Sequence, residues 1–253
     1  MSECEICGGV GLVRVKSDAG LWVSRACECQ ESQAEDLRIK SARIPNKYRK
    51  CTLDSYWIDF TNAHESLNSA LRTARKFVDA YPIDTKGKGL LFVGANGLGK
   101  THLAVGVLQR LIRERGVQGL FFDYRELLKH IQSSYNPQVQ ATELEILRPI
   151  LNAEVLIIDD IGTQKPTDWV WDTVAYVLNA RYNGELSTII TTHFPALPAG
   201  KGQLTDPEKA AREISLGDRI GDSMLSRLCE MCIRVEMSGG DFRQSVKRAS
   251  FGS

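Results

Sequence analysis

The chain has 253 residues, of which 43% are hydrophobic and 25% are charged, and its formal net charge at pH 7 is +1. This length allows one full α/β core and a small accessory module, and the near-neutral charge argues against a protein that holds nucleic acid by bulk charge alone. The sequence has no run of about 18 apolar residues and a polar N-terminus, so we expect no membrane span, no secretory signal and a cytoplasmic protein. Seven cysteines in a reducing compartment favour metal ligands or buried thiols over disulfides.

The first 30 residues combine closely spaced cysteines with two alternating segments. The cysteines form two pairs: Cys4 with Cys7, and Cys27 with Cys29. Residues 11–15 and 21–25 alternate like the two strands of a hairpin, with a turn at 17–20. Such a hairpin would bring four thiolates together as a tetrahedral zinc site, and the metal would stabilise a unit too small to rely on apolar burial. Four free surface thiols are the alternative.

The segment after the last of these cysteines connects the hairpin to the rest of the chain. Residues 30–40 predict a linker helix, and the basic stretch 41–50 is broken by Pro45, which predicts an extended crossing. Segments that enter a nucleotide-binding core often cover the base, so Ile44 and Tyr48 are candidates for that contact, with a solvated linker as the alternative. A helix with one apolar side is expected over 63–81.

The next stretch joins an apolar strand to a helix through a glycine loop. Residues 90–93 are apolar, as a strand buried on both faces requires, and the loop matches G-x-x-x-x-G-K-[ST] at every fixed position. The candidate nucleotide-binding residues are Gly94, Ala95, Asn96, Gly97, Leu98, Gly99, Lys100, Thr101 and His102. Loop N–H groups would wrap the β-phosphate of ATP, Lys100 would bridge the β- and γ-phosphates, and the Thr101 hydroxyl would hold Mg²⁺. A chance glycine turn is the competing interpretation.

Two later apolar runs end in polar residues. A strand at 119–123 is followed by helices at 124–134 and 142–151, and then the run 154–160 ends in Asp159 and Asp160. Asp159 would orient Mg²⁺ through its water shell, and Asp160 would accept a proton from the attacking water or position it; a strand with an acidic turn is the alternative. After a helix that Thr167 and Asp168 begin, the strand 188–193 ends in His193. This histidine, or failing that Thr192, would sense the γ-phosphate, unless it is a structural histidine.

The C-terminal third contains three arginines of interest: Arg219, Arg227 and Arg243. Helical segments are expected over 206–232. Arg219 and Arg227 are eight residues apart and would share one helical face if that helix is unbroken at Gly221. An arginine there would complete the ATP site of a neighbouring subunit. Cys229 and Cys232 are interpreted as buried thiols. A strand at 233–237 precedes Arg243, a candidate second sensor of the γ-phosphate.

The order of these features resembles that of the AAA+ ATPases. Within them, the phrases LIIDDIG at 156–162, SRLCEMC at 226–232 and GGDFR at 239–243 look most like the bacterial replicative helicase loaders of the DnaC/DnaI type, and more distantly the IstB transposition ATPases. The resemblance covers about residues 43 to 248. It implies a five-stranded parallel sheet in the order 5-1-4-3-2 with a short C-terminal lid, preceded by the cysteine module.

The same resemblance implies ATP with Mg²⁺, ATP sites shared between subunits of a homo-oligomer, and weak binding of single-stranded DNA. Residues 1–40 would be a zinc-binding knuckle and linker helix that docks on a replicative helicase of the DnaB type, and 41–253 the AAA+ ATPase domain. The sequence departs from the family at His193, where asparagine is usual. Asp160 replaces the glutamate that is common in other AAA+ proteins, although Asp-Asp is usual in the loader subgroup. Arg227, in its Ser-Arg-Leu context, matches the trans-acting arginine better than Arg219.

These features together predict an ATP-hydrolysing helicase loader. An IstB-like transposition helper, which would recognise duplex DNA, is the second interpretation, and the cysteine module argues mildly against it. A P-loop kinase of a small metabolite is a further interpretation. Such a kinase would need an acceptor-binding lid, whereas residues 194–253 look like an arginine-bearing interface. A zinc-bearing adaptor with a structural nucleotide is the interpretation from a different class.

Overall fold

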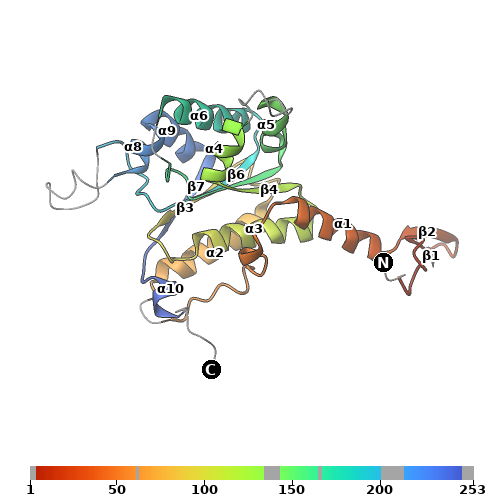
Figure 1. Ribbon diagram of the computed structural model, residues 1–253. Helices are drawn as coiled ribbons and strands as arrows, with labels where there is room; N and C mark the ends of the chain where they lie inside the picture. The colour runs from red at the N-terminus through yellow and green to blue at the C-terminus, as the bar shows by residue number, and fades with distance from the viewer. Residues whose placement is uncertain (1–3, 61–62, 134–142, 165–166, 201–213, 247–253) are drawn as a thin grey trace.

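A computed structural model describes residues 4–60, 63–133, 143–164, 167–200 and 214–246 (Figure 1). Its main body is a five-stranded sheet in the order β4-β5-β6-β3-β7, and every neighbouring pair is parallel. The strands are β3 (Gly89–Gly94), β4 (Gly119–Asp123), β5 (Val155–Asp159), β6 (Ser187–Thr192) and β7 (Cys232–Met237). Numbered from the glycine-loop strand, this order is 5-1-4-3-2, so the expected topology is confirmed.

Helices cover both faces of the sheet (Figure 1). One side carries α2 (Glu65–Ala80) and α3 (Lys100–Arg115), and the other carries α4 (Tyr124–Ser133), α5 (Glu143–Asn152), α6 (Asp168–Asn183), α8 (Leu216–Ile220) and α9 (Asp222–Met231). A hydrophobic cluster fills each interface. Since both faces are covered, the inner strands β3 and β5 need the continuous apolar runs that the sequence provides. Within the described ranges, no helix is both long and apolar enough to cross a membrane.

The strand register decides which residues meet at the carboxyl edge of the sheet. Val93 of β3 pairs with Thr192 of β6, and Ile158 of β5 pairs with Ile190 of β6. The ends of β3, β5 and β6 therefore lie side by side. This edge receives the glycine loop, Asp159 and His193, which come from separate parts of the chain.

The C-terminal helical region differs from the prediction. The helix breaks at Gly221, whose φ of 83° ends α8 and whose N–H caps it on the Gly217 carbonyl. Arg219 and Arg227 therefore lie on two helices and do not share one helical face. The first part of the expected segment, 206–213, lies outside the described residues. The last strand begins at Cys232, one residue before its predicted start.

The N-terminal hairpin stands apart from the sheet (Figure 1). Its strands β1 (Leu12–Lys16) and β2 (Trp22–Ala26) pair antiparallel, as predicted. Helix α1 (Glu28–Ser41) connects the hairpin to the main body, where Arg113 of α3 forms an ion pair with Glu35 at 3.2 Å. The crossing that follows contains one 3-10 turn, η1 (Asn46–Tyr48), within the stretch predicted to be extended.

Candidate nucleotide-binding site

The glycine loop ends at the first turn of α3. Gly97 and Gly99 both have φ of 82°, a left-handed conformation that side chains with a Cβ rarely adopt. The Lys100 ammonium donates to the carbonyls of Gly94 at 2.7 Å and Ala95 at 2.8 Å. Burial lowers the pKa of Lys100 to about 8, against the opposing attraction of the two carboxylates at the end of β5. The charge of Lys100 is therefore held inside the loop, where a phosphate would lie.

The metal-binding groups predicted from separate motifs lie in contact. The Thr101 hydroxyl donates to Asp159 Oδ1 at 2.7 Å, although 58 residues separate the two. Asp159 is 6% exposed, and burial raises its pKa while hydrogen bonds from Thr191 and Thr101 oppose that rise. A hydroxyl and a carboxylate are the oxygen donors that Mg²⁺ prefers in nucleotide sites, so this pair fits the expected ion.

Asp160 and His193 form a second contact at the same edge. His193 Nδ1 lies 2.8 Å from Asp160 Oδ1, and both side chains are partly exposed. Asp160 has φ of 59°, so the chain turns directly after β5 and directs this carboxylate toward the tip of β6. Thr192 is fully buried; its hydroxyl donates to the Ile161 carbonyl and accepts from the Phe194 N–H. That hydroxyl is committed to the backbone, so Thr192 is not placed to sense a phosphate.

A pocket of about 240 Å³ lies beside the glycine loop. Its lining is mainly aromatic and comes from three segments of the chain: Ser55, Tyr56, Trp57, Phe60, Gly97, Leu98, Gly99, His102 and Phe242. The ring centroid of Phe242 lies 5.9 Å from that of Trp57 and 5.2 Å from that of Phe60. Tyr56 donates its hydroxyl to the Leu98 carbonyl at 2.7 Å. This lining suits a flat base next to the phosphate loop.

The residues expected to cover the base lie elsewhere. Ile44 is buried in the core, and the Tyr48 ring packs 6.3 Å from Phe121. Gln109, in the third turn of α3, donates to the Cys51 carbonyl at 2.8 Å, which holds this segment beside the middle of the helix. The prediction for Ile44 and Tyr48 is therefore wrong, because the core uses their side chains before the chain reaches the loop.

His102 lies at the junction between the loop and this pocket. Its Nε2 is 2.8 Å from the Thr52 carbonyl and 3.1 Å from Ser55 Oγ, and its ring meets Tyr56 edge to face at 5.4 Å. His102 therefore ties the start of α3 to the segment that forms one wall of the pocket.

The C-terminal segment closes onto the glycine loop. The Phe242 N–H donates to the Gly97 carbonyl at 3.2 Å, and a Cβ on Gly97 would lie 1.9 Å from Asp241 Oδ1. This close approach accounts for glycine at position 97 in addition to its φ. Arg243, in the short helix α10 (Phe242–Ser245), is exposed, and its charge contributes to the lowered pKa of Lys100.

The two remaining arginines have different surroundings. The Arg219 guanidinium lies 4.8 Å from the ring centroid of Phe194, the neighbour of His193. The Arg227 guanidinium lies 5.4 Å from the ring centroid of Tyr182 on α6. Arg219 is thus near the strand tip of its own subunit, and Arg227 lies beside α6 on the same side of the sheet.

The four N-terminal cysteines gather at one point. Their sulfur atoms all lie within 4.8 Å of one another, with Cys4 and Cys27 at 3.8 Å and Cys7 and Cys29 at 3.5 Å. Tetrahedral zinc with Zn–S bonds of about 2.3 Å places its sulfurs about 3.8 Å apart. A hydrogen bond from the Gly11 N–H is the main cause that lowers the pKa of Cys7 to about 6, whereas hydrogen bonding with the neighbouring thiols raises the pKa of Cys29. The geometry and the donor set fit zinc.

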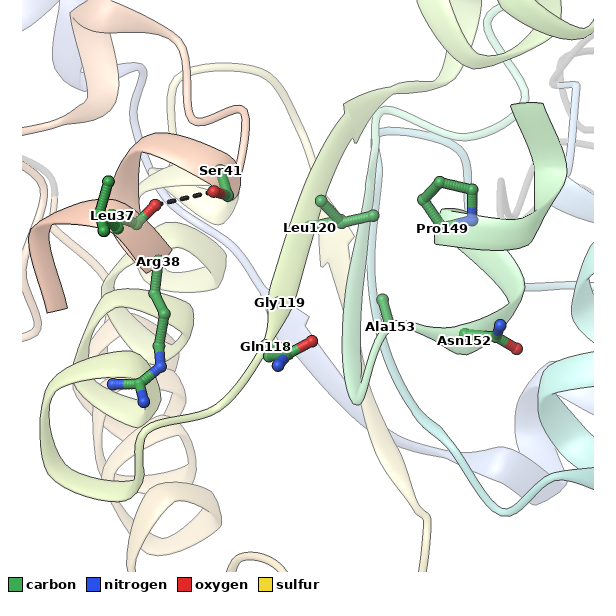
Figure 2. A pocket seen from close by; sticks show the side chains of 9 residues that line it. All are labelled: Leu37, Arg38, Ser41, Gln118, Gly119, Leu120, Pro149, Asn152 and Ala153. Carbon is green, nitrogen blue, oxygen red and sulfur yellow. Dashed lines mark hydrogen bonds between the residues drawn. The ribbon is translucent and has the colours of Figure 1, made fainter. Parts of the chain in front are cut away.

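A larger cavity of about 410 Å³ lies at the opposite end of the sheet, between α1, the start of β4 and α5 (Figure 2). Its lining is Leu37, Arg38, Ser41, Gln118, Gly119, Leu120, Pro149, Asn152 and Ala153. Arg38 is the one charged residue in this set, and its guanidinium packs near Gly116 at the end of α3. The cavity lies far from the carboxyl edge of the strands, so we do not assign the nucleotide to it.

Sequence reasoning identified the loop and the carboxylates but missed Thr191 and the aromatic wall. Thr191 bonds to both carboxylate residues through its hydroxyl. The sequence could have indicated Thr191, because it is a polar residue in a predicted buried strand, and the expected sheet order places that strand beside the Asp-Asp strand. The aromatic wall gave no such signal, because Trp57 and Phe242 are distant in sequence and meet only in the folded chain.

Comparison with known proteins agrees with this geometry. A family model described as IstB-like ATP binding protein matches residues 29–250. A replicative helicase loader, DnaC of Buchnera aphidicola subsp. Baizongia pistaciae, is 24% identical over 211 residues, which cover 83% of this chain and 75% of that protein. The crystal structure of a DnaC helicase loader is 31% identical with a TM-score of 0.63, covering 77% of this chain and all of that one. A DnaI structure at 23% identity and TM-score 0.59 shares the fold, over 78% of this chain and 95% of that one.

Proposed function

The chain belongs to the IstB-like ATP-binding protein family, and on that premise we propose that it is an AAA+ ATPase that loads a replicative helicase onto DNA. The contact that carries the ATPase part is the bond between Thr101 of the loop and Asp159 of β5. It joins the phosphate-binding and metal-orienting groups at one point beside Lys100. The loader part is supported by relatives named replicative helicase loaders, which match most of the chain.

The residues at the carboxyl edge of the sheet would have different roles in hydrolysis. The loop N–H groups and Lys100 would bind the β- and γ-phosphates, and Thr101 with Asp159 would hold Mg²⁺. Bound Mg²⁺ would neutralise charge on the phosphoryl oxygens. Asp160 would accept the proton of the attacking water or orient it, and the contact with His193 at 2.8 Å keeps this carboxylate at the strand tip. The aromatic pocket would hold the base.

Completion of the site by a neighbouring subunit is the next part of the proposal. Arg243 would reach the γ-phosphate from the subunit's own C-terminal segment, which is attached to the loop through Phe242. Arg227 would act on the ATP of the neighbour, because its family context matches and its helix lies on the other side of the sheet from α3. Arg219, near Phe194, is the alternative. ATP binding would then favour a homo-oligomer.

Turnover measurements with mixed subunits test this site. We expect Arg227→Ala alone and Lys100→Ala alone to be inactive, and their mixture to recover part of the wild-type rate. Recovery requires that an intact loop on one subunit receive an arginine from the next. Unchanged turnover by Arg227→Ala would contradict its role, and the same mixture with Arg219→Ala would then decide for the other arginine.

The hairpin is the proposed docking surface for the helicase, and the ATPase domain would bind single-stranded DNA. The hairpin displays large apolar side chains to solvent, including Leu21 and Trp22. We expect Trp22→Ser in the full chain to reduce co-purification of a ring helicase, whereas Ile83→Ser, on an exposed turn of the main body, leaves it unchanged. Equal recovery with both variants would contradict docking through the hairpin.

A transposition helper is the second candidate, because the matching family model is described by its likeness to IstB. Such a protein would recognise duplex DNA and a transposase. Recovery of a transposase in place of a helicase, together with tighter binding of duplex than of single-stranded DNA, would favour this candidate.

A further inference from the structure

We infer that Thr191 is the positioning residue for both carboxylates at the end of β5, Asp159 and Asp160. The inference rests on the proposed ATP site and adds to it a residue that sets the metal dependence. Thr191 is 1% exposed and lies on β6 beside β5. Its hydroxyl donates to Asp159 Oδ1 at 2.7 Å and accepts from the Asp160 N–H at 2.8 Å. A hydroxyl has one proton to donate, and this one holds two adjacent residues at once.

The first bond fixes the rotation of the Asp159 carboxylate. Oδ1 accepts from Thr191 on one side and from Thr101 on the other, each at 2.7 Å. Because both hydroxyls use the same oxygen, the carboxylate is held in one orientation and Oδ2 is directed away from them. Oδ2 is then the oxygen suited to accept from a metal-bound water. Without Thr191, the carboxylate would keep Thr101 as its hydroxyl partner and could rotate about that contact.

The second bond supports an unfavourable backbone conformation. Asp160 has φ of 59°, in the left-handed region that residues with a Cβ rarely adopt. The bond from its N–H to Thr191 and the bond from Thr163 Oγ1 to its carbonyl, at 3.0 Å, stabilise this conformation. This turn brings the Asp160 carboxylate to His193. Loss of the Thr191 hydroxyl would therefore loosen the proton-accepting group as well as the metal-orienting one.

The backbone of Thr191 has a separate role that substitution leaves intact. Its carbonyl accepts from the Ile161 N–H at 2.9 Å, which pairs the strand tip with the turn after β5. A change of side chain thus removes the two hydroxyl bonds and retains this pairing. Thr188, on the same strand and equally buried, provides a matched control, because its hydroxyl accepts from Arg181 at 2.9 Å and lies at the opposite end of the strand from the carboxylates.

The experiment compares Thr191→Val, Thr191→Ser and Thr188→Val in the full chain. Binding of a fluorescent ATP analogue is titrated with Mg²⁺, and turnover and Tm are measured in parallel. For Thr191→Val we expect the Mg²⁺ concentration at half-maximal binding to rise about tenfold and kcat to fall about 10- to 100-fold, as for other groups that orient a metal ligand. Thr191→Ser should stay close to wild type. Thr188→Val should lower Tm at least as much as Thr191→Val and leave the Mg²⁺ dependence unchanged.

The outcomes separate the inference from the proposal on which it rests. Normal Mg²⁺ dependence in Thr191→Val, or an equal shift in Thr188→Val, would overturn the positioning role while the ATP site stood. Failure of the wild-type protein to bind the analogue with Mg²⁺ would overturn both. If valine prevents folding, Thr191→Cys keeps the volume and weakens both bonds, so a smaller shift in the same direction is expected. Wild-type behaviour of that variant would count against the inference.

Discussion

The sheet that carries the glycine loop and the hairpin that carries the four cysteines differ in what covers their strands. Every residue of β5 and β6 is buried, whereas every residue of β2 is exposed. Burial of apolar area can hold the sheet, at about 25 cal/mol per Å², but it cannot hold a hairpin whose side chains remain in water. The hairpin therefore needs another source of stability, and its cysteine cluster is the group that can supply one.

Metal removal is the strongest test of this difference. Zinc contributes about 10–16 kcal/mol to the folding of small zinc-finger peptides, so a chelator should unfold the hairpin and leave the sheet folded. We expect amides of β1 and β2 to lose their protection from hydrogen exchange, while those of β5 and β6 keep theirs. Purified protein should contain one zinc per chain, and Cys229→Ser should not change that content. A hairpin that stays protected without metal would break the comparison.

The next largest effect, a loss of thermal stability, is expected from replacing a buried charge that packs against the sheet. Arg181 is fully buried on α6. It donates to four oxygens: Thr188 Oγ1, Ile150 O, Ala153 O and Ser187 O. Arg181→Met would leave these buried acceptors without their donor, at a cost of about 3 kcal/mol or more. We expect thermal unfolding to show a Tm lower by about 6 °C or more, with hairpin protection unaffected.

The control for this prediction is an arginine on the surface. Arg110 pairs with Glu114 one turn along α3, and both side chains are at least one-third exposed. Such pairs contribute roughly 0.3–0.5 kcal/mol, so Arg110→Met should leave Tm nearly unchanged. Equal losses from the two variants would show that the contacts of Arg181 with the Ile150 and Ala153 carbonyls do not stabilise the sheet.

The lowered pKa of Lys100 predicts a smaller effect, which is a dependence of the affinity for ATP on pH. Burial sets this pKa to about 8, so the ammonium is charged below pH 8 and loses its proton above it. Nucleotide phosphates need the charged form, and affinity for ATP should therefore weaken as pH rises. Between pH 7 and pH 9 the charged fraction of a group with this pKa falls about tenfold, and we expect the Kd for ATP to rise by the same factor. The measurement is a binding titration at constant ionic strength.

Lys100→Arg is the matched control, because a guanidinium keeps its proton throughout this range. Its Kd should show little change between the two pH values, whatever its absolute level. A Kd for the wild type that stays constant would mean that the bound phosphate or the carboxylates of Asp159 and Asp160 hold the proton more strongly than burial releases it.

The sequence predicted most of the sheet because its signals are local. Apolar runs identified the buried strands, and the loop motif identified the helix that follows β3. The order of the strands came from the resemblance to AAA+ proteins, since periodicity carries no information about neighbours. The break at Gly221 was not resolved, because apolar spacing continues through it and only the backbone φ ends α8.

The site residues that belong to sequence motifs were predictable, whereas those that are brought together only by folding were not. Lys100, Thr101 and Asp159 follow from motif positions, and their contact follows from sheet order. Tyr48 was misplaced because an aromatic residue before the core can serve packing as well as binding, and here it packs on Phe121. The aromatic pocket forms only when residues 55–60 and Phe242 meet beside the glycine loop.

The pocket beside the glycine loop is lined by loop residues and by residues at the start of two helices, His102 of α3 and Phe242 of α10. Tyr56 is its most buried aromatic, and its hydroxyl donates to the Leu98 carbonyl at 2.7 Å. Tyr56→Phe removes one hydrogen bond worth about 1 kcal/mol and retains the ring against His102. We expect ATP affinity to fall about fivefold in a binding titration, because the loop carbonyl loses the contact that fixes it.

Tyr176→Phe, on an exposed part of α6, should leave this affinity unchanged. Unchanged affinity in Tyr56→Phe as well would mean that the glycine loop keeps its shape through α3 and the C-terminal segment alone. Residues 55–60 would then contribute to the pocket only through their aromatic rings. A loss that appears for ATP but not for a triphosphate without a base would instead show that this hydroxyl acts through the base pocket, which would separate base binding from phosphate binding within the same loop.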